Sequence, residues 1–138
     1  MRRKLFSLLA SLFVPLVLLG TSANSAASSR PARHDIDHVV ISASTRAFRA
    51  DAARVGLSEA QLRSGWQSVA TCEVGGNWSM IGSKYSGIGF LNTTWHEYGG
   101  DRFAPLAGHA TETQQIVIAM AVTGGWIPDQ SGCSPGGW

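Results

Sequence analysis

The stretch from Trp66 to Trp78 constrains this chain more than any other, because it carries both a helical pattern and a helix end. Read as a helix, it puts three apolar side chains and one carboxyl in line on a single face. Those positions are Trp66, Val69, Ala70 and Glu73, spaced i, i+3, i+4 and i+7. Gly75 and Gly76 then favour the left-handed turn that ends a helix. Glu73 is therefore predicted on the last helical turn, in register with a buried stripe.

This placement of Glu73 points to acid–base chemistry. A carboxyl that packs against apolar neighbours loses hydration, and this loss raises its pKa. A carboxyl that is still protonated near neutral pH can act as a general acid. The alternative is a solvated glutamate at a helix end, which is the commoner environment for this residue type. The apolar register and the Gly-Gly-Asn-Trp run that follows favour the first interpretation.

The first 27 residues have the composition of a secretory signal peptide. Basic residues at positions 2–4 precede an apolar run from Leu5 to Gly20, and small residues fill positions 21–27. A membrane anchor is the alternative, but the run is short for a membrane span and Pro15 interrupts it. We therefore predict that residues 1–27 are removed during export.

Removal of this segment changes the charge of the protein. The chain carries 11 Lys and Arg and 9 Asp and Glu, and three of the basic residues lie in the predicted signal peptide. The exported chain therefore has 8 basic and 9 acidic residues, a net charge of −1. The basic isoelectric point belongs largely to the removed part and does not indicate binding to nucleic acid.

The chain has two cysteines, Cys72 and Cys133. An even number of cysteines in an exported chain predicts one disulfide, with two free thiols as the alternative. The bridge would close a loop of about 60 residues and contribute roughly 4 kcal/mol by the chain-entropy model. A domain of about 80 residues has a thin core and benefits from such a link.

Residues 28–57 are predicted to form a linker or N-terminal extension. Within them, Thr45–Val55 is rich in Ala and Arg and predicts a short helix whose arginines face solvent or contact an acidic wall polymer. His34 and His38 stand at i, i+4, a spacing that can bind metal. No neighbouring residue completes a coordination shell, so solvated histidines are the favoured interpretation.

A mainly helical domain is predicted over residues 58–138. Ser58 and Gln61 fit a capping box, as do Ser64 and Gln67, so we expect a short turn and then a main helix that ends near Val74.

Three further elements are predicted in this domain. The glycine-rich segment Gly82–Leu91 predicts a loop or small hairpin. A second helix is expected from Asn92, with Thr94 and Glu97 as a capping box. A third helix is expected to start near Thr111. Its residues through Val122 are apolar on nearly all sides, so we expect it at the centre of the fold.

Few residues of this domain suit catalysis. The motifs of serine nucleophiles and of phosphate-binding loops are absent, and His96 and His109 stand alone. A metal site needs three or four converging groups, so these histidines are interpreted as surface residues. What remains is a carboxyl in a segment rich in Trp, Tyr, Asn and Thr. The aromatic rings can stack on the apolar faces of sugars, and Asn and Thr can form hydrogen bonds with sugar hydroxyls. Each tryptophan alone is more often part of a core.

The C-terminal part of the sequence resembles the resuscitation-promoting factor domain of actinobacteria. That domain is a small relative of lysozyme and of soluble lytic transglycosylases. The likeness extends in order from about Gly65 to Cys133. It rests on Cys72-Glu73-Val-Gly75-Gly76-Asn77-Trp78, Tyr85-Ser-Gly87-Ile-Gly-Phe90, Thr94-Trp95, Tyr98-Gly-Gly100, Phe103-Ala-Pro105, Gln114-Gln115-Ile116 and Gly125-Trp126.

The resemblance implies a small α+β, lysozyme-like fold and cleavage of peptidoglycan between N-acetylmuramic acid and N-acetylglucosamine. It implies that Glu73 is catalytic and that Thr94 and Tyr85 contact substrate; we add Trp78 as a candidate contact. Cys72 and Cys133 fall on the disulfide of the family. No cofactor or metal is implied, and the protein is expected to be secreted or in the cell wall.

Three differences from the family pattern concern substrate binding. Gly89 stands where the family commonly has Gln, and Gly124 where it has Gln or another polar residue. The loop between Trp78 and Thr94 is two residues shorter than usual. None of these differences removes the acid itself.

A glycosidase normally uses two carboxylates, and nothing in the spacing directs Glu97, Asp101 or Glu112 at Glu73. A lytic transglycosylase with one catalytic glutamate is therefore our preferred prediction. A muramidase of hydrolase type and a wall-binding or signalling module without turnover are the alternatives. Peptidoglycan glycan strands are the expected partner and a monomer the expected state. Binding to another cell-wall hydrolase is left open.

Overall fold

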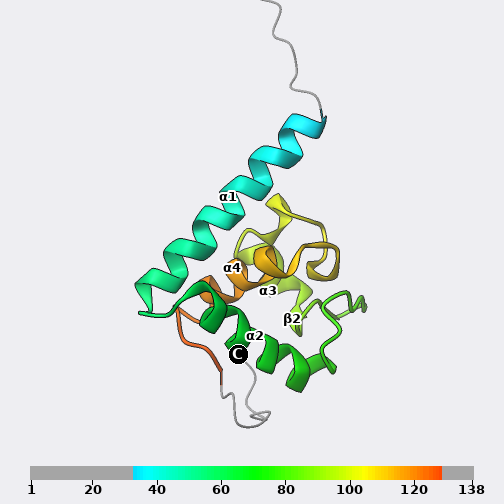
Figure 1. Cartoon of the computed structure of the whole chain (residues 1–138). Coiled ribbons are helices and arrows are strands. Elements are labelled where there is room, and N and C mark those ends of the chain that lie inside the picture. The colour runs from blue at the N-terminus through cyan, green and yellow to red at the C-terminus, as the bar shows by residue number, and fades with distance from the viewer. Residues whose placement is uncertain (1–32, 129–138) are drawn as a thin grey trace, which may run out of the picture. The chain divides into compact units, whose positions relative to one another are not determined.

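The computed structural model describes residues 33–128, which belong to one compact unit spanning Pro31–Trp138. The predicted signal peptide and Cys133 lie outside the described residues. No helix within the described part of the chain has the length and apolar composition that a membrane span requires. Helices dominate the fold and a two-stranded sheet completes it, which confirms the predicted mainly helical composition (Figure 1).

Helix α1, Arg33–Arg54, is much longer than the short helix predicted over Thr45–Val55. Its Ser44, Phe48 and Ala52 follow one another at i, i+4 and i+8 and are buried. This face packs along α4, Glu112–Val122 (Figure 1). The predicted linker or N-terminal extension is therefore helical from Arg33 to Arg54, and the core covers the apolar face of its second half.

Helix α2, Glu59–Val74, begins at the first of the two predicted capping boxes. The Ser58 hydroxyl accepts from the Gln61 backbone N–H at 3.2 Å, and the Gln61 side chain accepts from the Ser58 N–H at 2.9 Å. The expected short turn and main helix thus form one element, and the second box, at Ser64, lies inside it. Gly75 ends the helix at φ 63° in the left-handed region, as predicted.

The predicted hairpin is confirmed. Strands β1, Tyr85–Ser86, and β2, Phe90–Leu91, pair antiparallel with Tyr85 opposite Leu91 and Ser86 opposite Phe90. Helix α3, Asn92–Glu97, follows β2 directly. The predicted capping box of Thr94 and Glu97 is wrong, because the helix begins two residues earlier and has no side-chain cap.

Two short 3-10 turns, η1 at Gly100–Arg102 and η2 at Ala107–His109, lead from α3 to α4. Helix α4 begins at the predicted capping box of Thr111 and Gln114. Every residue from Gln114 to Met120 is buried, which confirms that this helix is central. Its pattern is apolar on nearly all sides because α1, α2 and η1 all pack around it.

One buried polar side chain on α4 joins three separate segments. The Gln115 Nε2 donates to the Trp78 carbonyl at 3.0 Å and to the Ala110 carbonyl at 3.1 Å. Its Oε1 accepts from the Ile88 N–H at 3.1 Å. Gly87 makes room for this amide, since a Cβ there would lie 2.3 Å from Oε1. The fully buried Gln115 therefore fixes the hairpin turn relative to α4 and to the loop after α2.

Replacing Gln115 by Leu keeps a similar volume but removes these hydrogen bonds. The Ile88 N–H and two carbonyls lose their partner in a buried setting, so we expect a loss of at least about 2 kcal/mol in the free energy of unfolding. Urea denaturation followed by circular dichroism measures it. Ala121→Leu, at an exposed position of the same helix, is the matched control and should change stability by less than about 0.5 kcal/mol. Equal stability of the two variants would contradict the role of Gln115.

Candidate functional site

Glu73 lies on the last turn of α2, one residue before the helix ends. The other members of its face, Trp66, Val69 and Ala70, are buried, so the predicted register is confirmed. Glu73 itself is exposed, and the predicted loss of hydration is not found. The reason is its place at the helix end, where the core no longer covers the face.

The side chain of Glu73 lies against the hairpin turn. A Cβ placed on Gly89 would lie 3.4 Å from the Glu73 Cβ and 3.7 Å from its carboxylate Oε2. Gly89 has a φ of 108°, a conformation that side-chain-bearing residues rarely adopt. The turn therefore brings bare backbone to the glutamate and leaves the space beside the carboxylate unfilled.

Tyr85 and Thr94, two of the three predicted substrate contacts, lie on the elements that adjoin this turn. Tyr85 is on β1 and is 44% exposed, with the Lys84 Nζ 5.2 Å from its ring centre. Thr94 is on α3 and is half-buried. The hairpin that contacts Glu73 thus carries Tyr85 on its first strand and leads directly into the helix of Thr94.

Trp78, the third predicted substrate contact, belongs mostly to the core. It is 8% exposed, and its Nε1 donates to the Gln67 Oε1 at 3.0 Å. Its carbonyl accepts from Gln115, so both ends of the residue are fixed. Trp78 is therefore placed to support the loop after Glu73 and offers little open surface.

The other carboxylates considered from the sequence have neighbours of their own. Asp101 contacts the His96 ring across the end of α3, and Glu112 lies 3.7 Å from Arg63. Glu97 is exposed at the end of α3. Residues 33–128 contain no group of three or more side chains that would hold a metal ion, and the side chain of His34 is not among those described.

The structure describes only one of the two cysteines of the predicted disulfide. Cys72 lies on α2 immediately before Glu73. Cys133 lies outside the described residues, so their pairing stays a prediction.

A polar network behind the hairpin was not predicted from the sequence. The Ser86 hydroxyl donates to the Asn92 Oδ1 at 2.7 Å and accepts from the Ala107 N–H at 3.1 Å. The Asn92 Nδ2 donates to the carbonyls of Gly82 and Ser83 at 3.0 and 3.3 Å. These bonds hold the strands, α3 and η2 together. The one sequence signal was a serine and an asparagine among apolar residues, which is too common to identify such a network.

Comparison with known proteins agrees with this arrangement. Residues 60–127 match the transglycosylase-like domain family. The chain is 42% identical over 88 residues to resuscitation-promoting factor Rpf1 of Corynebacterium glutamicum, which covers 62% of this chain and 46% of that protein. It is 42% identical over 65 residues to RpfB of Mycolicibacterium smegmatis, which covers 44% of this chain and 18% of that protein.

A third relative is RpfA of Mycobacterium tuberculosis, 46% identical over 59 residues, or 41% of this chain and 14% of that protein. The chain thus spans less than half of the length of each of these relatives. Residues 60–127 are thus similar to the transglycosylase-like domain, and the three relatives are resuscitation-promoting factors. This range includes all of α2 but its first residue, the hairpin, α3 and α4, and therefore Glu73 and Gly89.

Proposed function

We propose that this protein is a secreted enzyme that cleaves the glycosidic bond between N-acetylmuramic acid and N-acetylglucosamine in peptidoglycan. The observation that carries the proposal is the position of Glu73, an exposed carboxyl at the end of a buried helix face and against a glycine turn. The match to a transglycosylase-like family supports the class of reaction.

In the proposed mechanism Glu73 acts twice. Its carboxyl first donates a proton to the glycosidic oxygen, which leaves as the hydroxyl of the departing sugar. The carboxylate then accepts the proton of the C6 hydroxyl of the muramic acid as that oxygen bonds to C1. The product is a 1,6-anhydro ring, and the acid is restored. The substrate supplies the nucleophile, so this scheme needs no second carboxylate.

The partners of two other carboxylates support this scheme. Inverting and retaining glycosidases place two carboxyl groups on either side of the bond. Here Asp101 contacts His96, and Glu112 lies near Arg63. A muramidase remains the alternative because Glu73 is exposed, so that water has access to its carboxylate. The two reactions differ in the muramic acid end that they produce: a 1,6-anhydro ring from the transglycosylase and a reducing end from the muramidase.

Substrate binding is proposed to involve the exposed ring of Tyr85 and the hydroxyl of Thr94, on the elements next to Glu73. A tyrosine ring stacks on the apolar face of a sugar, and a hydroxyl bonds its polar groups. Trp78 is proposed to act mainly by shaping the loop beneath them, given its burial.

Export through the signal peptide of residues 1–27 and a cell-wall location are part of this proposal, as is a disulfide between Cys72 and Cys133. The bridge would connect the end of α2, next to Glu73, to the segment after α4. It would therefore limit the motion of the helix turn that carries the acid.

The central test is Glu73→Gln, which keeps the shape of the side chain but removes its proton chemistry. We expect cleavage of purified peptidoglycan to fall by at least about a thousandfold while the fold is retained. Mass spectrometry of the wild-type products should show anhydro-muropeptides; reducing ends instead would identify a muramidase.

The matched control for this test is Glu97→Gln, on the neighbouring helix, which should retain activity. Loss of activity in that variant would mean that a second carboxylate takes part. A wild-type protein that binds peptidoglycan without releasing any product would be a wall-binding module, and the enzyme proposal would be abandoned.

Gly89→Ala tests the contact between the turn and the acid. The new Cβ must adopt a φ of 108° and lies against Glu73, so we expect both a loss of stability of about 1–2 kcal/mol and reduced cleavage by the folded protein. Gly56→Ala is the control, since Gly56 also has positive φ but no atom lies within 4 Å of its Cβ position. If both variants cleave equally well when folded, the turn does not position the acid.

The disulfide is tested on the exported protein by mass spectrometry of unreduced peptides, which should contain one peptide pair linked through Cys72 and Cys133. Replacing both cysteines by serine should lower the free energy of unfolding by about 2–4 kcal/mol, because the open chain gains conformational freedom when unfolded. Detection of two free thiols in the folded, exported protein would refute the pairing.

A further inference from the structure

Helix α1 carries a second apolar stripe, beside the face that packs on the core. Its members recur at spacings of 4, 3 and 4 residues, the pattern of a helix that pairs with another helix. They are Ile36, Val40, Ala43 and Ala47. Ile36 is 47% exposed and Ala43 is also exposed. In Figure 1 the first turns of α1 extend beyond the other described elements.

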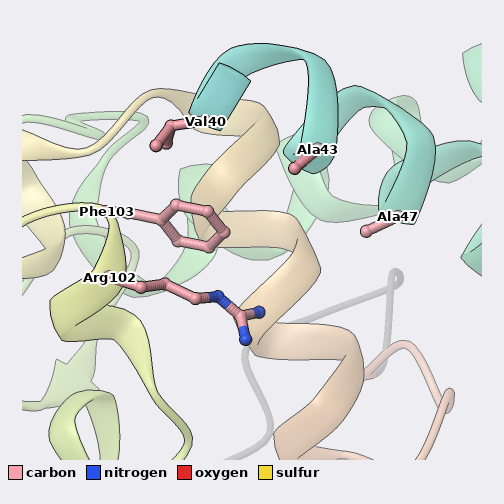
Figure 2. Close-up of a pocket in the computed structure, with 5 residues that line it drawn as sticks. All are labelled: Val40, Ala43, Ala47, Arg102 and Phe103. Atoms are coloured by element: carbon pink, nitrogen blue, oxygen red, sulfur yellow. The ribbon is translucent and has the colours of Figure 1, made fainter. Parts of the chain in front are cut away.

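A pocket of about 340 Å³ lies along this stripe, lined by Val40, Ala43, Ala47, Phe103 and Arg102. Figure 2 shows the Phe103 ring and the Arg102 side chain next to the three α1 residues. The Arg102 guanidinium lies 4.7 Å from the ring centre and forms no ion pair within residues 33–128. The pocket thus combines apolar walls with one available positive charge.

The same helix carries the complementary feature at its start. Ile36 stands between Asp35 and Asp37, and all three are exposed. Neither aspartate has an ion-pair partner in the described part of the chain. An apolar side chain between two acids matches an apolar pocket with a cation beside it. A rigid helix cannot fold back to place its own Ile36 beside its Ala47, so an Ile36 that pairs with Ala47 belongs to another copy.

We propose that the occupant is a second copy of this chain, with the two α1 helices antiparallel about a two-fold axis. Val40 of each copy then meets Ala43 of the other, and Ile36 meets Ala47. The same surface serves both partners, so the assembly closes at two copies. Alanine at positions 43 and 47 lets the two helices approach closely.

The charges fit this arrangement on both sides of the stripe. At 100° per residue, Asp37 falls on the side of α1 that faces the core, where Phe103 and Arg102 line the pocket. Asp35 and Arg46 fall on the opposite side. Like sides face each other in an antiparallel pair, so Asp37 of one copy faces Arg102 of its partner. Asp35 likewise faces Arg46, which has no ion-pair partner in the described residues.

A seam of one helix pair is small compared with a standard protein interface of about 1,600 Å². The dimer is therefore weak and forms at high local concentration, and salt weakens it further because its charged pairs are exposed. This inference replaces the monomer expected from the sequence. It uses none of the residues proposed for catalysis, so it stands or falls independently of the enzyme proposal.

The test is sedimentation velocity on the exported chain over a range of protein and salt concentrations. The wild type should shift from monomer to dimer as concentration rises. Ala43→Glu puts two like charges at the two-fold axis and should weaken the dimer at least about tenfold. Ala53→Glu adds the same charge at an exposed position of α1 beyond Ala47, outside the seam, and should leave the dimer unchanged. A wild type that stays monomeric throughout, or equal effects of the two variants, would overturn the proposal.

A charge exchange tests the register. Arg102→Glu and Asp37→Arg should each weaken the dimer, and the double variant should restore it, because every copy carries both changes. Circular dichroism confirms that each variant is folded. A double variant as weak as the single ones would overturn the antiparallel pairing.

Discussion

The buried amide of Gln115 is the interaction on which the rest of this structure depends. A domain of this size has few residues to bury. The region opposite Glu73 consists of loops and a hairpin whose two strands have two residues each. Such segments have little packing of their own. The amide gives them a fixed reference, since it bonds at once to the loop after α2, to the hairpin turn at Ile88 and to the segment before α4. Glycine at position 87 is the local condition that lets this happen.

Two constraints, one on α2 and one on the glycine turn, determine the placement of Glu73. The buried face of α2 fixes the helix, and the glycine turn, held by the amide, fixes what lies opposite its last turn. The last turn of α2, which carries Glu73, is consequently well defined in position, and the Glu73 side chain is exposed to solvent. Positioning rather than burial is thus what the apo protein supplies, and a bound glycan would itself displace water from the carboxyl.

Helix α1 shows how one element can serve two surfaces. Its core face contributes Phe48 and Ala52 to the packing around α4. Its neighbouring face carries the apolar stripe and the charges that we assign to pairing of two copies. A core face and an apolar stripe on one helix of 22 residues are not expected of a linker. The helix therefore both completes the small core and offers a contact surface away from Glu73.

Local patterns in the sequence determined where α2 ends and where α4 begins, because left-handed glycines and capping boxes act between residues three or four apart. They also determined the register of Glu73 and the central place of α4, since helical periodicity sorts apolar residues by face. Tertiary structure decided that the second half of α1 belongs to the core, because its weakly apolar pattern becomes a buried face only where α4 covers it. It also decided the exposure of Glu73, the burial of Trp78 and the bonds of Gln115 and Ser86. These features depend on contacts between residues far apart in the chain, which local sequence patterns do not predict.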